Sequence, residues 1–154
     1  MRLDDDMQRV VREQSLGFVA TVCPDGTANL SPKGTTAVWD DEHLVFLHIH
    51  SPGTVANLAT NPSIEVNVVD PIVRKGYRFK GRAEVVTDGE LYAEVLDRFQ
   101  RERGTDTQRV QAVVLMRVDH AAPLLSPVYD TGATEAEVTK RWRDHHLGLS
   151  EGRD

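Results

Sequence analysis

The stretch LVFLHIHSPGTVANLATNP, residues 44–62, decides the fold because it joins a buried strand directly to the start of a helix. Residues 44–49 are apolar on both alternating faces except at His48, which predicts a strand covered on both sides and central in its sheet. Ser51 as N-cap and Pro52 at the first helical position predict a helix. Asn61-Pro62 ends it, because proline cannot continue a helix.

Five further strands and three further helices are predicted around this unit. The strands are expected at residues 17–23, 27–36, 63–69, 77–86 and 110–118. The helices are expected at 3–14, 87–103 and 134–142, the last two opened by capping boxes at Thr87 and Thr134. The turns between the strands 17–23, 27–36 and 43–49 are too short for parallel crossovers. The prediction is therefore a mainly β (α+β) fold, a six-stranded antiparallel barrel with a few peripheral helices.

The composition argues against several classes of protein. Twenty-four acidic residues against eighteen Lys and Arg give a net charge of −6, which disfavours a nucleic-acid binder. No apolar run approaches the ~20 residues of a membrane helix, and the acidic N-terminus is unlike a secretory signal. The single cysteine, Cys23, cannot form an internal disulfide. We expect a cytoplasmic protein with no membrane or nucleic-acid partner.

Two polar stretches are candidates for binding a ligand. If Ser51 caps its helix, Ser51 and Thr54 flank free backbone N–H groups, which is a suitable place for a phosphate. The alternative is that Ser51 is only a helix cap. The stretch Asn29-Leu30-Ser31-Pro32-Lys33 interrupts a strand with proline, and such interruptions mark a close approach by a ligand or a plain edge irregularity.

Histidines and basic residues form two further candidate groups. His48 and His50 flank Ile49 on one predicted strand and would point to the same side. No third metal ligand follows at a recognisable spacing, so we favour a structural or cofactor-lining role and expect no metal site. Arg78 and Lys80 lie on one face of another strand, either as a counter-charge for an anionic small molecule or as a solvated face paired with acids.

The order of these signals resembles the FMN-binding split barrels related to pyridoxamine 5′-phosphate oxidase. The resemblance covers a core of about residues 7–118 within one domain, 1–154, and leaves 119–154 as a C-terminal extension. The tail at 126–132 with Trp142 is similar to one branch of that family. The motifs that carry the resemblance in the core are 17–21 with Pro24-Asp25-Gly26, 29–33, 51–58 with Asn61-Pro62, and 76–83 before Thr87-Asp88.

This resemblance implies a six-stranded split barrel that forms a homodimer, with FMN in a cleft between the subunits. The flavin ring would lie against 29–33, residues 48–50 would line the same cleft, and the phosphate would lie near Ser51 and Thr54. Relatives often carry a lysine or arginine beside this threonine, where this chain has Gly53. The groups that we expect to take its place, or to cover the ring from the partner subunit, are Lys33, Arg78, Lys80 and Trp142.

The function implied by the resemblance is an FMN-dependent oxidoreductase that transfers a hydride or electrons with a small molecule. A deazaflavin in place of FMN is one alternative, and Gly53 keeps it open. A non-catalytic flavin-binding or electron-carrier protein is another, and a dimerising domain without ligand is a third. Pyridoxamine phosphate oxidase activity itself is not expected, because only Arg141-Trp142-Arg143 resembles the longer C-terminal substrate segment of that enzyme.

Overall fold

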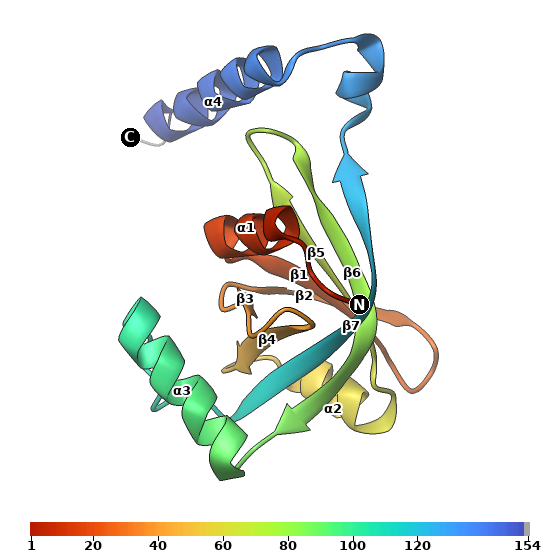
Figure 1. Cartoon of the computed structure of the whole chain (residues 1–154), viewed down its shortest axis with the longest axis vertical. Helices are drawn as coiled ribbons and strands as arrows, with labels where there is room; N and C mark the ends of the chain where they lie inside the picture. The colour runs from red at the N-terminus through yellow and green to blue at the C-terminus, as the bar shows by residue number, and fades with distance from the viewer. Residues whose placement is uncertain (153–154) are drawn as a thin grey trace.

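A single antiparallel sheet, curled into a half-barrel, forms the body of the molecule (Figure 1). The computed structural model describes residues 1–152. The order of strands across the sheet is β2-β1-β5-β6-β7-β4-β3, and every neighbouring pair is antiparallel. The strands are β1 (Gly17–Val22), β2 (Ala28–Lys33), β3 (Ala37–Val38), β4 (His43–His48), β5 (Ser63–Asp70), β6 (Lys75–Val86) and β7 (Ala112–Leu125). The antiparallel split-barrel prediction is confirmed.

The strand count is seven within residues 1–152, so the prediction of six was wrong. The predicted strand 27–36 is interrupted, because the backbone N–H and Oγ1 of Thr36 both donate to the carbonyl of Lys33 and close a turn there. After this turn the chain forms β3, and it is β3 rather than β2 that pairs with β4. The last strand also continues to Leu125, because β7 pairs with β6 as far as the β5–β6 turn.

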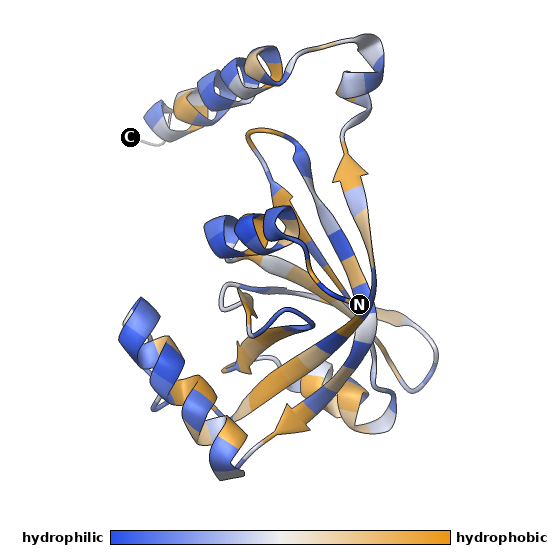
Figure 2. Ribbon diagram, in the orientation of Figure 1, coloured by the Kyte–Doolittle hydropathy of each residue, from blue (hydrophilic) through white to orange (hydrophobic). Residues whose placement is uncertain are grey.

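Strand β4 is buried on both faces, as predicted, although it lies next to the edge strand rather than at the centre of the sheet. Leu44 and Phe46 pack in the barrel interior, whereas Val45 and Leu47 belong to a second apolar cluster with Phe99 and other residues of α3 (Gly89–Arg103). Helix α3 therefore covers the outer face of β4, which is why β4 is buried on both faces although it lies near the edge of the sheet. In Figure 2, β4 and β7 are largely hydrophobic and α1 and α4 largely hydrophilic.

The three remaining helices are α1 (Asp5–Gln14), α2 (Pro52–Thr60) and α4 (Glu135–Glu151). The capping box at Thr134 is present, and α4 continues past its predicted end at residue 142. The capping box at Thr87 is absent, because Asp88 occupies the N-cap of α3 and makes no side-chain cap bond. Ser51 occupies the N-cap of α2 but likewise makes no such bond. Met7, Val10 and Val11 bury the inner face of α1 against the barrel.

The helices α2 and α4 lie at opposite ends of the molecule (Figure 1). A short 3-10 helix, Pro127–Thr131, leads from β7 to α4 beyond the β5–β6 turn. Within residues 1–152 no helix is both long enough and apolar enough to cross a membrane.

Candidate functional site

The buried polar side chains of this protein are concentrated where β1, β2 and β4 approach α2. Six polar or charged residues are less than 9% exposed, among the residues that the structure describes: Thr21, Lys33, Thr36, His48, Thr54 and Asn57. Burial of a polar group is costly unless it finds a partner. A buried polar group of this region that has no partner within the chain is therefore a candidate contact for a ligand.

An amide–hydroxyl network joins the strands to α2. The side-chain amide of Asn57 donates to Thr21 Oγ1 at 3.0 Å. Asn29 donates from its amide to the same oxygen at 3.2 Å and lies 3.5 Å from Thr54 Oγ1. Asn29 and Thr54, both predicted from the sequence, are thus brought together. Thr21 and Asn57 were missed, although Asn57 stands three residues after Thr54 on the buried face of α2.

The two predicted serines lie together beside this network. The Oγ atoms of Ser31 and Ser51 are 3.3 Å apart, so the hydroxyl of Ser51 is directed to β2 instead of capping α2. The first backbone N–H groups of a helix have no partner within it. Because Ser51 does not cap them, those of α2 remain available to an anion at the positive end of the helix dipole.

Lys33 places a buried positive charge on the same face of β2. Its exposed fraction is 6%, and burial lowers its pKa without any carboxylate in the described chain to offset the effect. Its Nζ lies 6.0 Å from the centre of the Phe46 ring. An unpaired buried ammonium is unfavourable by itself, so its environment suits the arrival of an anionic group.

His48 lies beside Lys33 because the turn after β2 binds to β4: the hydroxyl of Thr35 accepts from the Leu47 N–H at 2.9 Å. Burial lowers the pKa of His48, and the positive charges of Lys33 and His50 lower it further. Its Nδ1 is buried and has no hydrogen-bond partner among residues 1–152. His48 therefore adds an imidazole with an unpartnered ring nitrogen to the surroundings of Lys33.

The lowered pKa of His48 predicts a loss of stability in acid. Below about pH 6.5 the unfolded chain binds a proton that the folded chain resists, so the free energy of unfolding should fall as the pH drops from there through the folded-state pKa. Urea unfolding at a series of pH values tests this. His48→Gln should flatten the dependence below pH 6.5, whereas His120→Gln, at an exposed position of β7, is the matched control. Equal slopes in all three proteins would contradict the expectation.

Other predicted site residues lie apart from this cluster. Leu30 and Pro32 point to the opposite face of β2 and are exposed. His50 lies beyond the end of β4 and is exposed, so it does not share a strand face with His48. Ile49, between them, is half-buried against the α3 cluster. Within residues 1–152 no three His, Cys, Asp or Glu side chains are grouped as metal ligands.

Arg78 and Lys80, here called the basic stripe, and Trp142 also have partners within the chain. Glu65 on β5 pairs with Arg78 Nε at 2.8 Å and with Lys80 Nζ at 3.3 Å, which favours the interpretation as a solvated, charge-paired outer face. Trp142 stacks on Arg74, whose Cζ lies 3.4 Å from the ring centre, at the β5–β6 turn. This turn and α2 are at opposite ends of the molecule, so Trp142 does not reach Thr54 within one chain (Figure 1).

The outer face of β1 and β2 carries no polar side chain. Its largest exposed residues are Phe18 at 42%, Val22 at 37% and Leu30 at 66%. Ala20, Ala28 and Pro32 lie on the same face by alternation along the two strands. An apolar sheet face of this kind is a typical protein interaction surface. It lies on the other side of β2 from Asn29, Ser31 and Lys33.

A curled antiparallel half-barrel of this kind is a split barrel. A family model described as Pyridoxamine 5'-phosphate oxidase matches residues 3–121. The chain therefore belongs to the pyridoxamine 5′-phosphate oxidase family. A search of curated proteins gave no match.

Solved structures agree with this assignment. HupZ of Group A Streptococcus is 31% identical with a TM-score of 0.71, over 80% of this chain and 95% of that one. An F420 reductase is 24% identical with a TM-score of 0.61, over 78% and 98% of the two chains. HutZ, described as the heme storage protein from Vibrio cholerae, is 21% identical with a TM-score of 0.63, over 81% and 95%. The last two share the fold.

Proposed function

We propose that this chain is a flavin-binding oxidoreductase that holds FMN against β2 and the start of α2 and exchanges a hydride or electrons with a small molecule. The observation that supports it best is the unpaired, buried charge of Lys33 beside a helix start that no side chain caps. An anionic ligand with a phosphate end and a polar ring satisfies both features. Membership in the pyridoxamine 5′-phosphate oxidase family supports the same cofactor.

The residues present fit the two ends of such a ligand. At the phosphate end, Ser51, Thr54 and Asn29 offer hydroxyl and amide groups, and the first turn of α2 offers backbone N–H groups. At the ring end, the ammonium of Lys33 would stabilise negative charge near N1 and O2, and the free Nδ1 of His48 offers a further polar contact. Bound flavin supplies the redox chemistry, so the protein needs only to orient it and exclude water.

A second copy of the chain would complete the site. The apolar outer face of β1 and β2 is a surface on which a second copy could dock, and β2 carries Asn29 and Lys33 on its other face. A homodimer also provides the only route by which Trp142, Arg78 or Lys80 of another subunit reaches the ligand. The half-buried Cys23, the one cysteine of the sequence, is compatible with the reducing cytoplasm, where we propose that the protein works.

Titration of the purified, ligand-stripped chain separates the proposed cofactors. Quenching of flavin fluorescence measures FMN affinity. Parallel titrations use a deazaflavin and haemin, because structures with this fold include an F420 reductase and a heme storage protein. Stoichiometric FMN binding with reduction by a nicotinamide cofactor and reoxidation by a small acceptor supports the proposal. Tighter binding of the deazaflavin would identify it as the cofactor in place of FMN. If bound flavin is reduced but no small acceptor reoxidises it, the protein is an electron carrier. Binding of haemin without binding of either flavin would refute the oxidoreductase and the carrier proposals.

Replacing Thr54 with valine should weaken FMN binding by about 1–3 kcal/mol, or roughly 5- to 150-fold in Kd. The change removes a hydroxyl that is 1% exposed while keeping the shape of the side chain, so the fold is preserved. Thr60→Val at the exposed end of the same helix is the matched control. Calorimetry with FMN is the measurement, and an unchanged Kd in the Thr54 variant would remove this residue from the phosphate contacts.

A further inference from the structure

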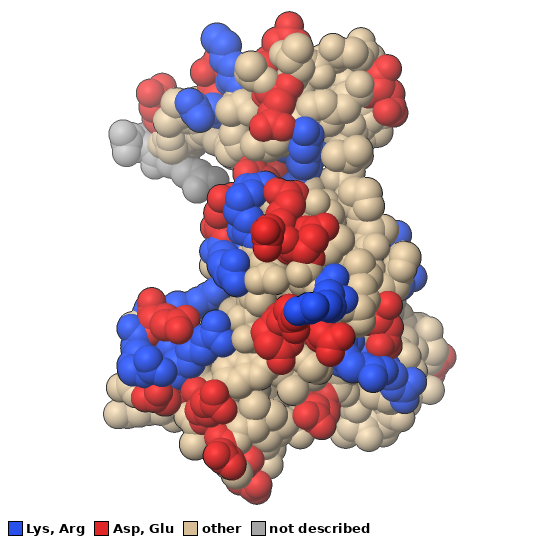
Figure 3. Space-filling model, in the orientation of Figure 1, with Lys and Arg blue, Asp and Glu red and all other residues tan. Residues whose placement is uncertain are grey.

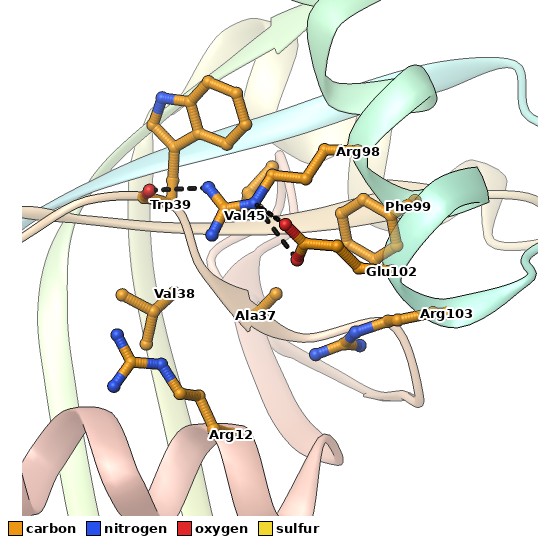
Figure 4. A pocket seen from close by; sticks show the side chains of 9 residues that line it. All are labelled: Arg12, Ala37, Val38, Trp39, Val45, Arg98, Phe99, Glu102 and Arg103. Atoms are coloured by element: carbon orange, nitrogen blue, oxygen red, sulfur yellow. Dashed lines mark hydrogen bonds and ion pairs between the residues drawn. The ribbon is translucent and has the colours of Figure 1, made fainter.

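A separate cavity lies between α1, β3–β4 and α3, on the side of the barrel that the candidate flavin site does not use. It has a volume of about 220 Å³ and shares no lining residue with that site. Figure 4 shows its walls: the side chains of Val38 and Val45 come from the strands, Phe99 from α3, and three guanidinium groups point toward the space. The three arginines are Arg12, Arg98 and Arg103.

The charge of this cavity is unbalanced. Its one acidic lining residue, Glu102, lies 3.3 Å from Arg98 Nε and neutralises that guanidinium. Within residues 1–152 neither Arg12 nor Arg103 forms an ion pair with a carboxylate; their neutral partners are the side chain of Gln8 and the backbone carbonyl of Thr36. Two guanidinium groups thus lack a carboxylate partner of their own in a chain whose net charge is −6. Figure 3 shows basic side chains gathered over α3 on the side next to α1.

The arginines of α3 are held in position before any ligand arrives. Arg98 donates to the Trp39 carbonyl at 2.9 Å and lies over the Trp39 ring, with Cζ 5.2 Å from its centre. The guanidinium of Arg103 lies over the Phe99 ring at 5.1 Å. Although the Arg103 side chain is largely exposed, partial burial lowers the pKa of its guanidinium; the charge of Glu102 opposes this effect and that of Arg98 adds to it. A guanidinium that is held by stacking on a ring presents its paired N–H donors in a fixed orientation, which suits it to bind phosphate.

We propose that this cavity is a second ligand site, which binds the phosphate group of a small phosphate monoester. Arg12 and Arg103 form charge-assisted hydrogen bonds to the phosphate oxygens from two different helices. The apolar wall of Val38, Val45 and Phe99 contacts the organic part of the ligand. Free phosphate presents the same oxygens to the arginines without using the apolar wall. The site goes beyond the proposed flavin function and does not depend on it.

Calorimetry of the full chain with inorganic phosphate, phenyl phosphate and phenol at constant ionic strength tests the site. Both phosphates should bind and phenol should not, and tighter binding of phenyl phosphate would assign the site to a monoester instead of free phosphate. Arg103→Gln should weaken phosphate binding about tenfold. Arg101→Gln removes the same charge from the outer surface of α3, where Arg101 pairs with Asp97, and should change Kd less than twofold. Arg12→Gln repeats the test from α1.

Three outcomes would overturn the proposal. The first is no measurable binding of either phosphate. The second is an equal loss in the Arg101 and Arg103 variants, which would show general charge attraction. The third is loss of FMN affinity in Arg103→Gln with its thermal unfolding unchanged, because the cavity would then belong to the flavin site. Failure of FMN binding in the unmodified chain, with phenyl phosphate still bound, would instead refute only the proposed flavin function.

Discussion

Replacing Gly81 with alanine is expected to lower the free energy of unfolding by about 3 kcal/mol, which for a chain of this size corresponds to roughly 10 °C in Tm. Strands β6 and β7 shift register at this point: Lys80 pairs with His120 and Gly81 with Val118, which leaves Asp119 between them. A Cβ at position 81 would overlap the carbonyl oxygen of Arg117. Because backbone atoms of a paired strand cannot move aside, the bulge itself would have to open.

Urea unfolding followed by circular dichroism measures this loss. Gly34→Ala is the matched control, since a Cβ at Gly34 meets no atom within 4 Å, and it should change stability by less than about 0.5 kcal/mol. Equal stabilities of the two variants would mean that the bulge adjusts freely. The contrast matters for function, because β6 lies at the centre of the sheet order and links the β5 side to the β7–β4 side, from which His48 comes.

Local patterns predicted those parts of the fold in which neighbouring residues decide the structure. The β1–β2 hairpin, the direct passage from β4 to α2 and the capping box at Thr134 all follow from residues close together in sequence. The two-residue strand β3 has no alternation long enough to detect. The extension of β7 through Ala121, Ala122 and Pro123 depends on pairing with β6. Such pairing is tertiary and leaves no local signal.

The candidate site was predicted by its residue types but not by its contacts. Asn29, Ser31, Ser51 and Thr54 do come together, because β2 passes the start of α2. Ser51 was predicted as the N-cap of its helix, but its hydroxyl contacts Ser31 instead. Trp142 and the basic stripe were placed near the ligand by resemblance to relatives that form dimers, and one chain holds them elsewhere. Their part in the site therefore remains a proposal about a second subunit.

Replacing Lys33 with methionine is expected to weaken FMN binding about 10- to 100-fold while raising the stability of the ligand-free protein. The affinity falls because a charge-assisted contact to the flavin is lost. The stability rises because methionine keeps the apolar stem and removes a buried ammonium that lacks a carboxylate partner in residues 1–152. Fluorescence titration with FMN and urea unfolding of the ligand-free chain give the two numbers.

The opposite signs make this substitution more informative than a simple loss of binding. A lysine that served only the fold would lower stability when replaced, and its effect on FMN would follow from partial unfolding. Lys140→Met, an exposed lysine on α4 that pairs with Asp144, changes the net charge equally and should alter neither number by more than about 0.5 kcal/mol. If Lys33→Met lowers stability and leaves FMN affinity intact, the buried charge is a structural feature, and the flavin proposal loses its main support.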